Sequence, residues 1–263
     1  MDYQEICRQT CIIIQEVGEF IQEEAKKFSL ADVEIKSKNS LVTYVDKNAE
    51  KKLVAKLQQL IPSSGFITEE ETAINKGEIY NWIIDPLDGT TNFIHKLAPY
   101  AISVALTEGN ETIIGVVLEL SQNEIFHTFK GGKAYLNETE IKVSNTKTIE
   151  DSLIATGFPY YDFKILKPYM AILEELAQSS QGIRRLGSAA TDLAYVACGR
   201  FDIFFEYSLN PWDVAAGAFI VQQAGGIVTD FSKGDNYLFG REIIASNSTI
   251  HSEFQNIVQS KLH

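Results

Sequence analysis

Cysteine is scarce in this sequence, which has only Cys7, Cys11 and Cys198 among its 263 residues. An odd and sparse count argues against a disulfide framework and favours a reducing compartment, so we expect a cytoplasmic protein. Cys7 and Cys11 stand four residues apart on a predicted helix. Because the histidines form no HxxxH pattern and the sequence has no CxxC pair, the spacing does not indicate a zinc site.

Basic residues and long apolar runs are also lacking. The chain has 23 Lys and Arg against 35 Asp and Glu, a formal charge of −12, which fits neither a nucleic-acid backbone nor an anionic membrane surface. No apolar run approaches the roughly 20 residues that span a bilayer, and the acidic first five residues are not typical of a signal peptide. We therefore expect no nucleic-acid partner and no membrane partner. The acids either form a solvated surface or converge on cations.

Repeats and Pro- or Gly-rich linkers are absent too, which favours one domain over residues 1–263. Apolar residues recur at helical spacing from Asp2, a candidate cap, to about residue 27. An antiparallel meander is predicted at 102–108, 113–120 and 124–130. After about residue 145, strands and helices alternate. We expect an α+β lobe over residues 1–145 that shares an interface with an α/β lobe over residues 146–263.

The most informative stretch lies between residues 82 and 93. A predicted apolar strand delivers two carboxylates, Asp85 and Asp88, to its carboxyl end, and Pro86 fixes the backbone between them. Gly89 predicts a tight turn into a helix whose first N–H groups favour an anion. Acids beside an anion site repel each other unless hard cations lie between them. Mg²⁺ is commonly held in this way, by one or two carboxylates and substrate phosphate oxygens.

Simpler interpretations of this stretch stay open. Asp-Gly-Thr alone is usually a turn followed by a helix cap. Haloacid-dehalogenase phosphatases also use two aspartates, but theirs are two residues apart, whereas Asp85 and Asp88 are three apart. The sequence has neither GxxxxGK[ST] nor GxGxxG, so nucleotide-binding folds have no support.

Acids elsewhere in the chain could join this pair. Three glutamates, 69–71, follow a predicted strand at 65–68, although a glutamate triplet alone is usually a solvated face. Asp213 stands among apolar residues at a predicted helix start. Asp213 could simply complement the helix dipole, but a buried carboxylate is normally paired or metal-bound.

Together these segments resemble the inositol monophosphatase family. The resemblance rests on Glu69-Glu70 after a strand, Asp-Pro-x-Asp-Gly-Thr-Thr-Asn at 85–92, and Trp-Asp-x-Ala-Ala-Gly at 212–217, in that order. Shorter matches at 41–46, 187–190 and 224–228 extend it over nearly the whole chain. The resemblance implies a layered α-β-α-β-α sandwich, two or three Mg²⁺ ions, lithium sensitivity and a homodimer.

The resemblance also implies roles for individual residues. The metal ligands would be Glu69, Asp85, the Leu87 carbonyl, Asp88 and Asp213. The catalytic water would be steered and deprotonated by Glu69 and by the pair Thr90 and Asp46. Substrate would be bound by Gly89, Thr90, Ser188, Ala189 and Glu206. Glu70 would be a supporting acid, and either Lys36 or Lys38 the family's flexible-loop lysine. For Asp46, a plain helix N-cap before a helix at 47–60 is also expected.

The resemblance therefore implies hydrolysis of a small phosphomonoester by metal-activated water, with no phosphoenzyme. Glu206, as an acceptor for a substrate hydroxyl, favours a polyol, and inositol 1-phosphate is the first candidate. The 2′-phosphate of NADP(H), fructose 1,6-bisphosphate and a 3′-phosphonucleotide are alternatives. The complete ligand set argues against a catalytically silent regulatory or binding member, which is the other class of function considered.

Overall fold

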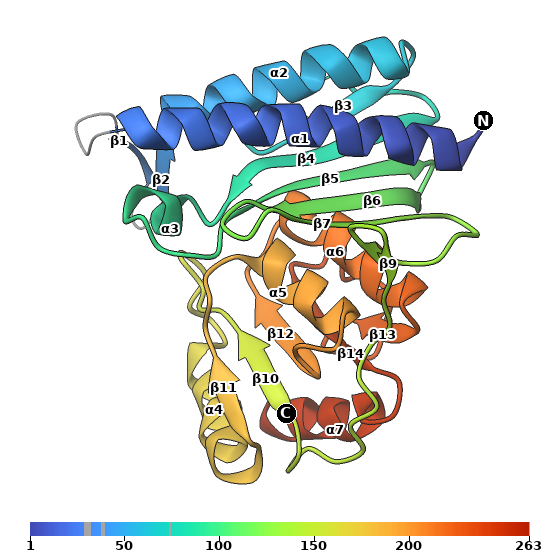
Figure 1. Cartoon of the computed structure of the whole chain (residues 1–263). Helices are drawn as coiled ribbons and strands as arrows, with labels where there is room; N and C mark the ends of the chain where they lie inside the picture. The colour runs from blue at the N-terminus through green and yellow to red at the C-terminus, as the bar shows by residue number, and fades with distance from the viewer. Residues whose placement is uncertain (29–32, 38–39, 74, 263) are drawn as a thin grey trace.

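The computed structural model describes residues 1–28, 33–37, 40–73 and 75–262, without the side chains of 33–37, 40 and 41. Two long helices, α1 (Tyr3–Lys27) and α2 (Tyr44–Leu60), form the first layer (Figure 1). An Asp2 side-chain oxygen accepts a hydrogen bond from the Glu5 N–H at 3.1 Å, so the predicted cap and helix are confirmed. A hairpin of β1 (Val33–Ser37) and β2 (Ser40–Thr43) leads into α2.

A seven-stranded sheet lies under these helices, in the order β3-β4-β5-β6-β7-β8-β9. Only β3 and β4 pair in parallel; the other neighbours are antiparallel, so the predicted meander is confirmed. The strands are β3 (Gly65–Thr68), β4 (Tyr80–Asp88), β5 (Ala101–Glu108), β6 (Glu111–Glu119), β7 (Glu124–Phe129), β8 (Tyr135–Leu136) and β9 (Thr139–Glu140). Along the chain, the short helix α3 (Thr90–Ile94) connects β4 to β5.

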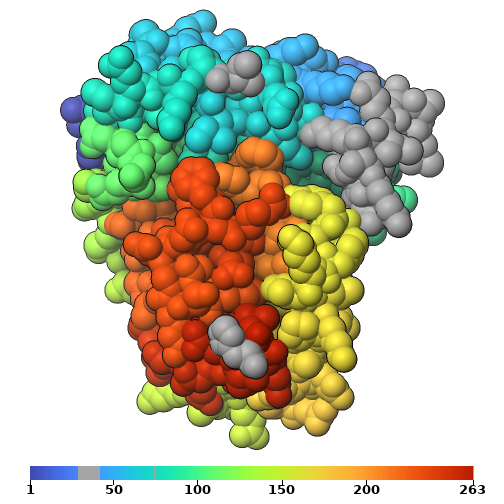
Figure 2. Space-filling view, turned by 180° about the vertical axis from the view of Figure 1, so that it is seen from behind, coloured from blue at the N-terminus to red at the C-terminus, as the bar shows by residue number. Residues whose placement is uncertain are grey.

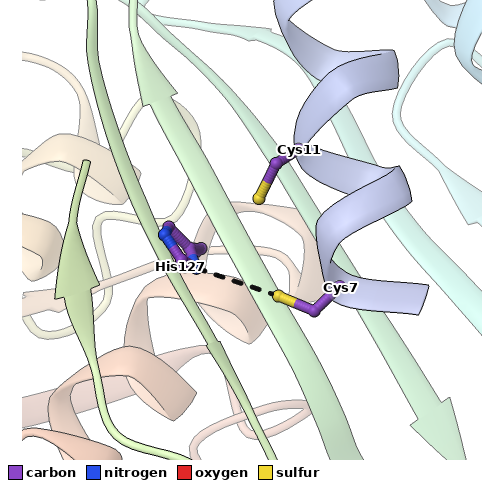
Figure 3. Close-up of side chains that lie close together, drawn as sticks. All are labelled: Cys7, Cys11 and His127. Carbon is purple, nitrogen blue, oxygen red and sulfur yellow. Dashed lines mark hydrogen bonds between the residues drawn. The ribbon is translucent and has the colours of Figure 1, made fainter. Parts of the chain in front are cut away.

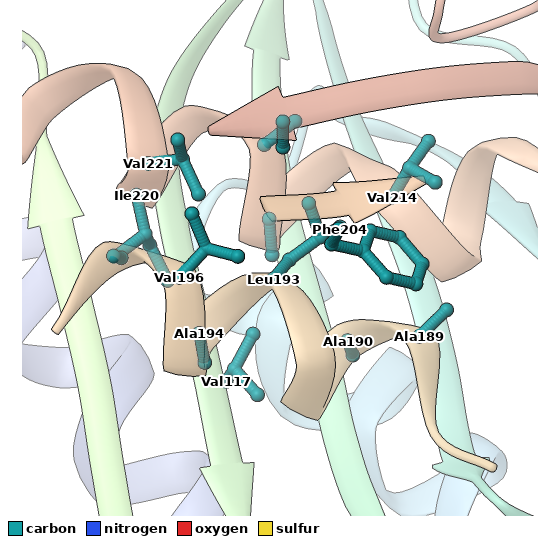
Figure 4. Close-up of a cluster of buried hydrophobic side chains, with 14 of the residues drawn as sticks. Val117, Ala189, Ala190, Leu193, Ala194, Val196, Phe204, Val214, Ile220 and Val221 are labelled. Carbon is teal, nitrogen blue, oxygen red and sulfur yellow. The ribbon is translucent and has the colours of Figure 1, made fainter. Parts of the chain in front are cut away.

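Two helices made largely of small and apolar residues form the middle layer, α5 (Ala189–Ala197) and α6 (Pro211–Gln223). Every residue of α5 is buried, including the polar Thr191 and Asp192, so neighbouring elements cover this helix on all sides. A Cβ on Gly115 would lie 2.8 Å from the Ala216 carbonyl oxygen, so α6 lies directly against β6. Figure 4 shows α5 and α6 side chains packed together between strands of both sheets.

A five-stranded sheet follows, in the order β11-β10-β12-β14-β13, with α4 (Leu166–Ser179) and α7 (His251–Leu262) as the last layer. Its strands are β10 (Leu153–Thr156), β11 (Gly182–Arg184), β12 (Ile203–Tyr207), β13 (Gly226–Thr229) and β14 (Glu242–Asn247). The predicted alternation of strand and helix holds up to β13. Because β14 pairs antiparallel with both β12 and β13, the sheet is mixed.

The layers therefore run α-β-α-β-α, and the predicted sandwich is confirmed (Figure 1). Seen from behind, the C-terminal half is stacked below the N-terminal half (Figure 2). The expected lobe boundary near residue 145 falls in the segment between β9 and β10. No helix among the described residues is long and apolar enough to span a bilayer.

Candidate active site

The carboxylates at the end of β4 are brought together by a bulge. Asp85 pairs with Ser103 and Asp88 pairs with Ala101, so three steps along β4 oppose two steps along β5. In a regular strand, residues three apart point to opposite faces; one extra residue returns them to the same face. Oxygens of Asp85, Asp88 and Asp213 all lie within 4.8 Å of one another.

Asp213 reaches this cluster from the start of α6. Pro211 is the first helical residue, and an Asp213 oxygen accepts a hydrogen bond from the Asn210 N–H at 2.6 Å. The Trp212 carbonyl accepts a hydrogen bond from the Ser103 hydroxyl at 3.1 Å, which fastens this helix start to β5. The first-turn position complements the helix dipole, as the simpler interpretation expected, and it also delivers a carboxylate to the cluster.

Glu69 lines the same pocket from the end of β3. The Glu69 N–H donates a hydrogen bond to the Ile84 carbonyl at 3.2 Å, so the residue is held beside β4. The loop that follows is anchored by Glu50, a fully buried carboxylate of α2 that accepts hydrogen bonds from the N–H groups of Glu70 and Thr72 at 2.8 and 2.9 Å. Sequence reasoning missed Glu50, because an acid within a helix usually faces solvent.

Asp46 is the third residue of α2, so its prediction as the N-cap is wrong; Thr43 caps the helix. The helix therefore begins one turn earlier in the chain than the sequence pattern predicted. One Asp46 oxygen accepts hydrogen bonds from the Thr43 N–H and hydroxyl at 2.9 and 2.5 Å. The other Asp46 oxygen accepts a hydrogen bond from the Thr90 hydroxyl at 3.0 Å. The same hydroxyl lies equally close to the Leu87 carbonyl oxygen. The structure thus brings Asp46 and Thr90 into the contact that the resemblance implied.

Gly89 turns the chain from β4 into α3. Its φ of +88° is a conformation that glycine adopts without strain. A Cβ at this position would also come within 3.1 Å of the Pro99 carbonyl oxygen and 3.2 Å of the Gly187 carbonyl oxygen. The backbone can therefore pass between these two segments, with Gly89 and Thr90 on the pocket wall.

Ser188 and Ala189 also line the pocket, next to Gly89, where α5 begins. One oxygen of Asp88 accepts hydrogen bonds from the Ser188 hydroxyl at 2.7 Å and the Ala190 N–H at 2.8 Å. The Ser188 hydroxyl also lies 2.8 Å from the Thr191 hydroxyl oxygen. Ser188 therefore orients a carboxylate of the cluster, a contact that the sequence did not suggest.

Glu206 is buried at the side of the pocket that the C-terminal sheet forms. Its carboxylate takes the space beside Gly157, where a Cβ would come within 2.1 Å of both carboxylate oxygens. Burial, and next the charge of Asp213, raise the pKa of Glu206 well above its ordinary value. Glu206 thus lies in the same pocket as the carboxylate cluster, as expected for a residue that meets the substrate.

The cluster is electrostatically unfavourable without a cation. Burial first, and then the charges of Glu69, Asp88 and Asp213, raise the pKa of Asp85 well above its ordinary value. Burial raises the pKa of Asp88 to about 6, although Ser188 and nearby N–H groups oppose the shift. Burial and then Asp88 raise the pKa of Asp213. Hard oxygen ligands that repel one another in this way fit Mg²⁺.

The rim of the pocket includes residues that sequence reasoning missed. Phe158, Tyr160 and Tyr161 line it from the segment after β10, and all three are exposed. Arg185 lines it too, and its guanidinium donates a hydrogen bond to the Tyr160 hydroxyl at 3.0 Å. The aromatic residues clustered at 158–163 were the sequence signal that could have identified this rim. Lys38 lies outside the described residues, as does the Lys36 side chain, so the flexible-loop lysine stays a prediction.

The layered α-β-α-β-α fold is shared with solved structures of inositol monophosphatases. Over residues 2–263 the chain matches the inositol monophosphatase family, and it belongs to that family. It is 40% identical over 244 residues to a protein named putative Nus factor SuhB from Neisseria meningitidis, covering 92% of this chain and 94% of that protein.

Solved structures agree. The extragenic suppressor protein suhB from Bartonella henselae is 34% identical, with a TM-score of 0.90 over 96% of this chain and 97% of that one. An IMPase from Thermotoga maritima is 35% identical, with a TM-score of 0.86 over 95% of both chains. The family resemblance drawn from the sequence is therefore confirmed, and the family is typically Mg²⁺-dependent.

Proposed function

We propose that this protein is a Mg²⁺-dependent phosphomonoesterase that hydrolyses a small phosphorylated polyol, with inositol 1-phosphate as the first candidate. The observation that carries the proposal is the convergence of Asp85, Asp88 and Asp213 within 4.8 Å, in a pocket that Glu69 also lines. Four carboxylates facing one small volume suit cations and not a bare anionic substrate.

The proposed ligands are Glu69, Asp85, the Leu87 carbonyl, Asp88 and Asp213, holding two or three ions. Bound Mg²⁺ would lower the pKa of a water molecule and neutralise the charge of the phosphate. Residues of the protein would bind the phosphate and position the water. The N–H groups of Gly89 and Thr90, at the wall of the pocket, would bind phosphate oxygens.

The Thr90–Asp46 pair would position the attacking water and remove its proton. The Thr90 hydroxyl donates a hydrogen bond to Asp46, so the lone pairs of its oxygen can accept a hydrogen bond from water. Burial raises the pKa of Asp46, so this carboxylate is a better proton acceptor than an exposed aspartate. Glu69, the residue that follows β3, would contact the same water.

Glu206 would accept a hydrogen bond from a hydroxyl of the leaving alcohol, which favours a polyol. The aromatic rim at Phe158, Tyr160 and Tyr161 gives a planar nucleotide a surface to stack on, so the 2′-phosphate of NADP(H) is the second substrate to test, followed by fructose 1,6-bisphosphate. We also propose a cytoplasmic homodimer that lithium inhibits.

The experiment is a phosphate-release assay on these three substrates with Mg²⁺, comparing wild type with Glu206→Gln. Replacing the carboxyl group of Glu206 by an amide is expected to raise KM for inositol 1-phosphate at least tenfold, and to change KM for NADP much less if stacking binds that substrate. Equal effects on all three substrates would contradict the assignment of Glu206 to a polyol hydroxyl.

A second candidate function is a binding role in transcription without turnover. It is favoured by the 40% identical relative, which is named a putative Nus factor. This function predicts that Mg²⁺ stabilises the fold while none of the phosphomonoesters is hydrolysed. Mg²⁺-dependent phosphate release would contradict this second candidate, because it would show that the site is catalytically active.

A further inference from the structure

We propose that Cys7, Cys11 and His127 form a second metal site, which takes a zinc-like cation with thiolate and imidazole ligands. One ligand atom from each of these residues lies within 4.8 Å of the others. Cys7 and Cys11 lie one turn apart on α1, and His127 lies on β7 below them. Figure 3 shows both sulfurs projecting from the helix toward the strand that carries the imidazole.

The distances are close to those of a tetrahedral site. Zinc binds sulfur at about 2.3 Å and nitrogen at about 2.0–2.1 Å, so two such ligands lie about 3.6–3.8 Å apart. Cys7 Sγ and His127 Nδ1 are 4.0 Å apart. Cys11 is half-buried, so its side chain can adjust and solvent can supply a fourth ligand.

The imidazole already presents the correct nitrogen. His127 Nε2 lies 2.9 Å from the Asn137 carbonyl oxygen. A carbonyl only accepts hydrogen bonds, so Nε2 carries the proton, and the neutral ring keeps its lone pair on Nδ1, which faces Cys7. A carbonyl behind the distal nitrogen is the usual support of a metal-bound histidine. Tyr135 stacks on the ring at 5.5 Å between centroids and 16° between planes, which fixes its orientation.

The cluster has the softness and charge of a zinc site, not a magnesium site. Binding would release one proton from each thiol to solvent, and two thiolates would then balance the charge of one divalent cation. A neutral complex suits a location where Cys7 is buried and its partners are half-buried. Neither α1 nor β7 contributes a residue to the active-site pocket, so the two metal sites use separate elements.

Cobalt substitution in excess Mg²⁺ tests this proposal, because only thiolate ligation gives the intense ligand-to-cobalt charge-transfer absorption in the near ultraviolet. The protein is reduced and handled without oxygen. We expect one Co²⁺ per chain with this absorption in wild type, displaced by one equivalent of Zn²⁺. Cys11→Ser, at the half-buried position, should lose the band and bind at least tenfold more weakly. Cys7→Ser and His127→Gln should weaken binding similarly.

Cys198→Ser is the matched control, since Cys198 is the third free cysteine and lies outside the cluster. It should keep the band and the stoichiometry. The proposal is overturned if wild type shows no thiolate band, if Cys11→Ser keeps it, or if Zn²⁺ stoichiometry is unchanged in the Cys7→Ser/Cys11→Ser double variant, which would assign the zinc to the carboxylates. Thermal unfolding of each variant without metal shows whether a lost band reflects a lost fold.

Discussion

Replacing Asp88 by Asn should stabilise the metal-free protein near neutral pH. The pKa of Asp88 is raised from its ordinary 3.8 to about 6, chiefly by burial. Between these values the folded state binds more protons than the unfolded state, so the stability of the fold falls as pH rises from about 4 to 7. An asparagine does not ionise, and its side-chain oxygen can still accept hydrogen bonds from Ser188 and Ala190.

The size of the effect follows from the shift. About two pKa units at about 1.4 kcal/mol each give roughly 3 kcal/mol as an upper limit. Asp88 is only partly buried, and solvent at the pocket reduces the gain to about 1–3 kcal/mol. For a chain of this size that corresponds to a rise in Tm of roughly 2–10 °C.

The assay is thermal unfolding in EDTA at pH 4 and pH 7.5, and again with Mg²⁺. Asp88→Asn should exceed wild type in Tm at pH 7.5 in EDTA and match it at pH 4. With Mg²⁺ at about 100 times Kd, wild type should gain about 2.7 kcal/mol and the variant much less. Asp235→Asn, at an exposed aspartate, should behave as wild type throughout. A metal-free Asp88→Asn less stable than wild type at pH 7.5 would refute the argument that burial of the Asp88 charge destabilises the metal-free fold.

Three further substitutions separate positioning from packing. Thr90→Val removes the hydroxyl that bonds to Asp46 and should lower kcat by a factor of about 10²–10⁴ with little change in Mg²⁺ affinity; an unchanged kcat excludes the pair from proton transfer. Gly157→Ala places a methyl group within 2.1 Å of the Glu206 carboxylate and should raise KM by displacing it, as steady-state kinetics would show. Phe204→Ala empties a fully buried position between the sheets and should cost about 3–5 kcal/mol in urea unfolding; a loss under 1 kcal/mol would contradict the packing described.

Much of the fold was predictable because its signals are local. The 3.6-residue spacing predicted α1, and apolar runs separated by the turns Gly109-Asn110 and Gln122-Asn123 predicted β5, β6 and β7. The strand β14 and the helix α7 were missed. The signal before α7 was overlooked: the Asn247 side chain accepts hydrogen bonds from the Thr249 and Ile250 N–H groups just before the helix begins. The antiparallel pairing of β14 depends on β12 and β13, which a local pattern cannot report.

The candidate site was predictable only in part, for a different reason. Motifs identified the acids, but the bulge that turns Asp85 and Asp88 to one face is a property of the pairing with β5. The buried Glu50 and the thiol partner His127 lie 20 or more residues from what they support, so spacing rules overlooked both. The start of α2 was predicted one turn too late, at Asp46, because Thr43 offers the helix an equally good cap.

The most direct test of the central claim measures phosphate release from inositol 1-phosphate as Mg²⁺ is titrated into metal-free protein, with Asp213→Asn and Asp235→Asn as a matched pair. Release should be absent in EDTA, rise with Mg²⁺ in wild type and in Asp235→Asn, and stay at least 10²-fold lower in a folded Asp213→Asn. Full activity in EDTA, or wild-type activity in Asp213→Asn, would contradict a metal-dependent phosphatase built on this carboxylate cluster.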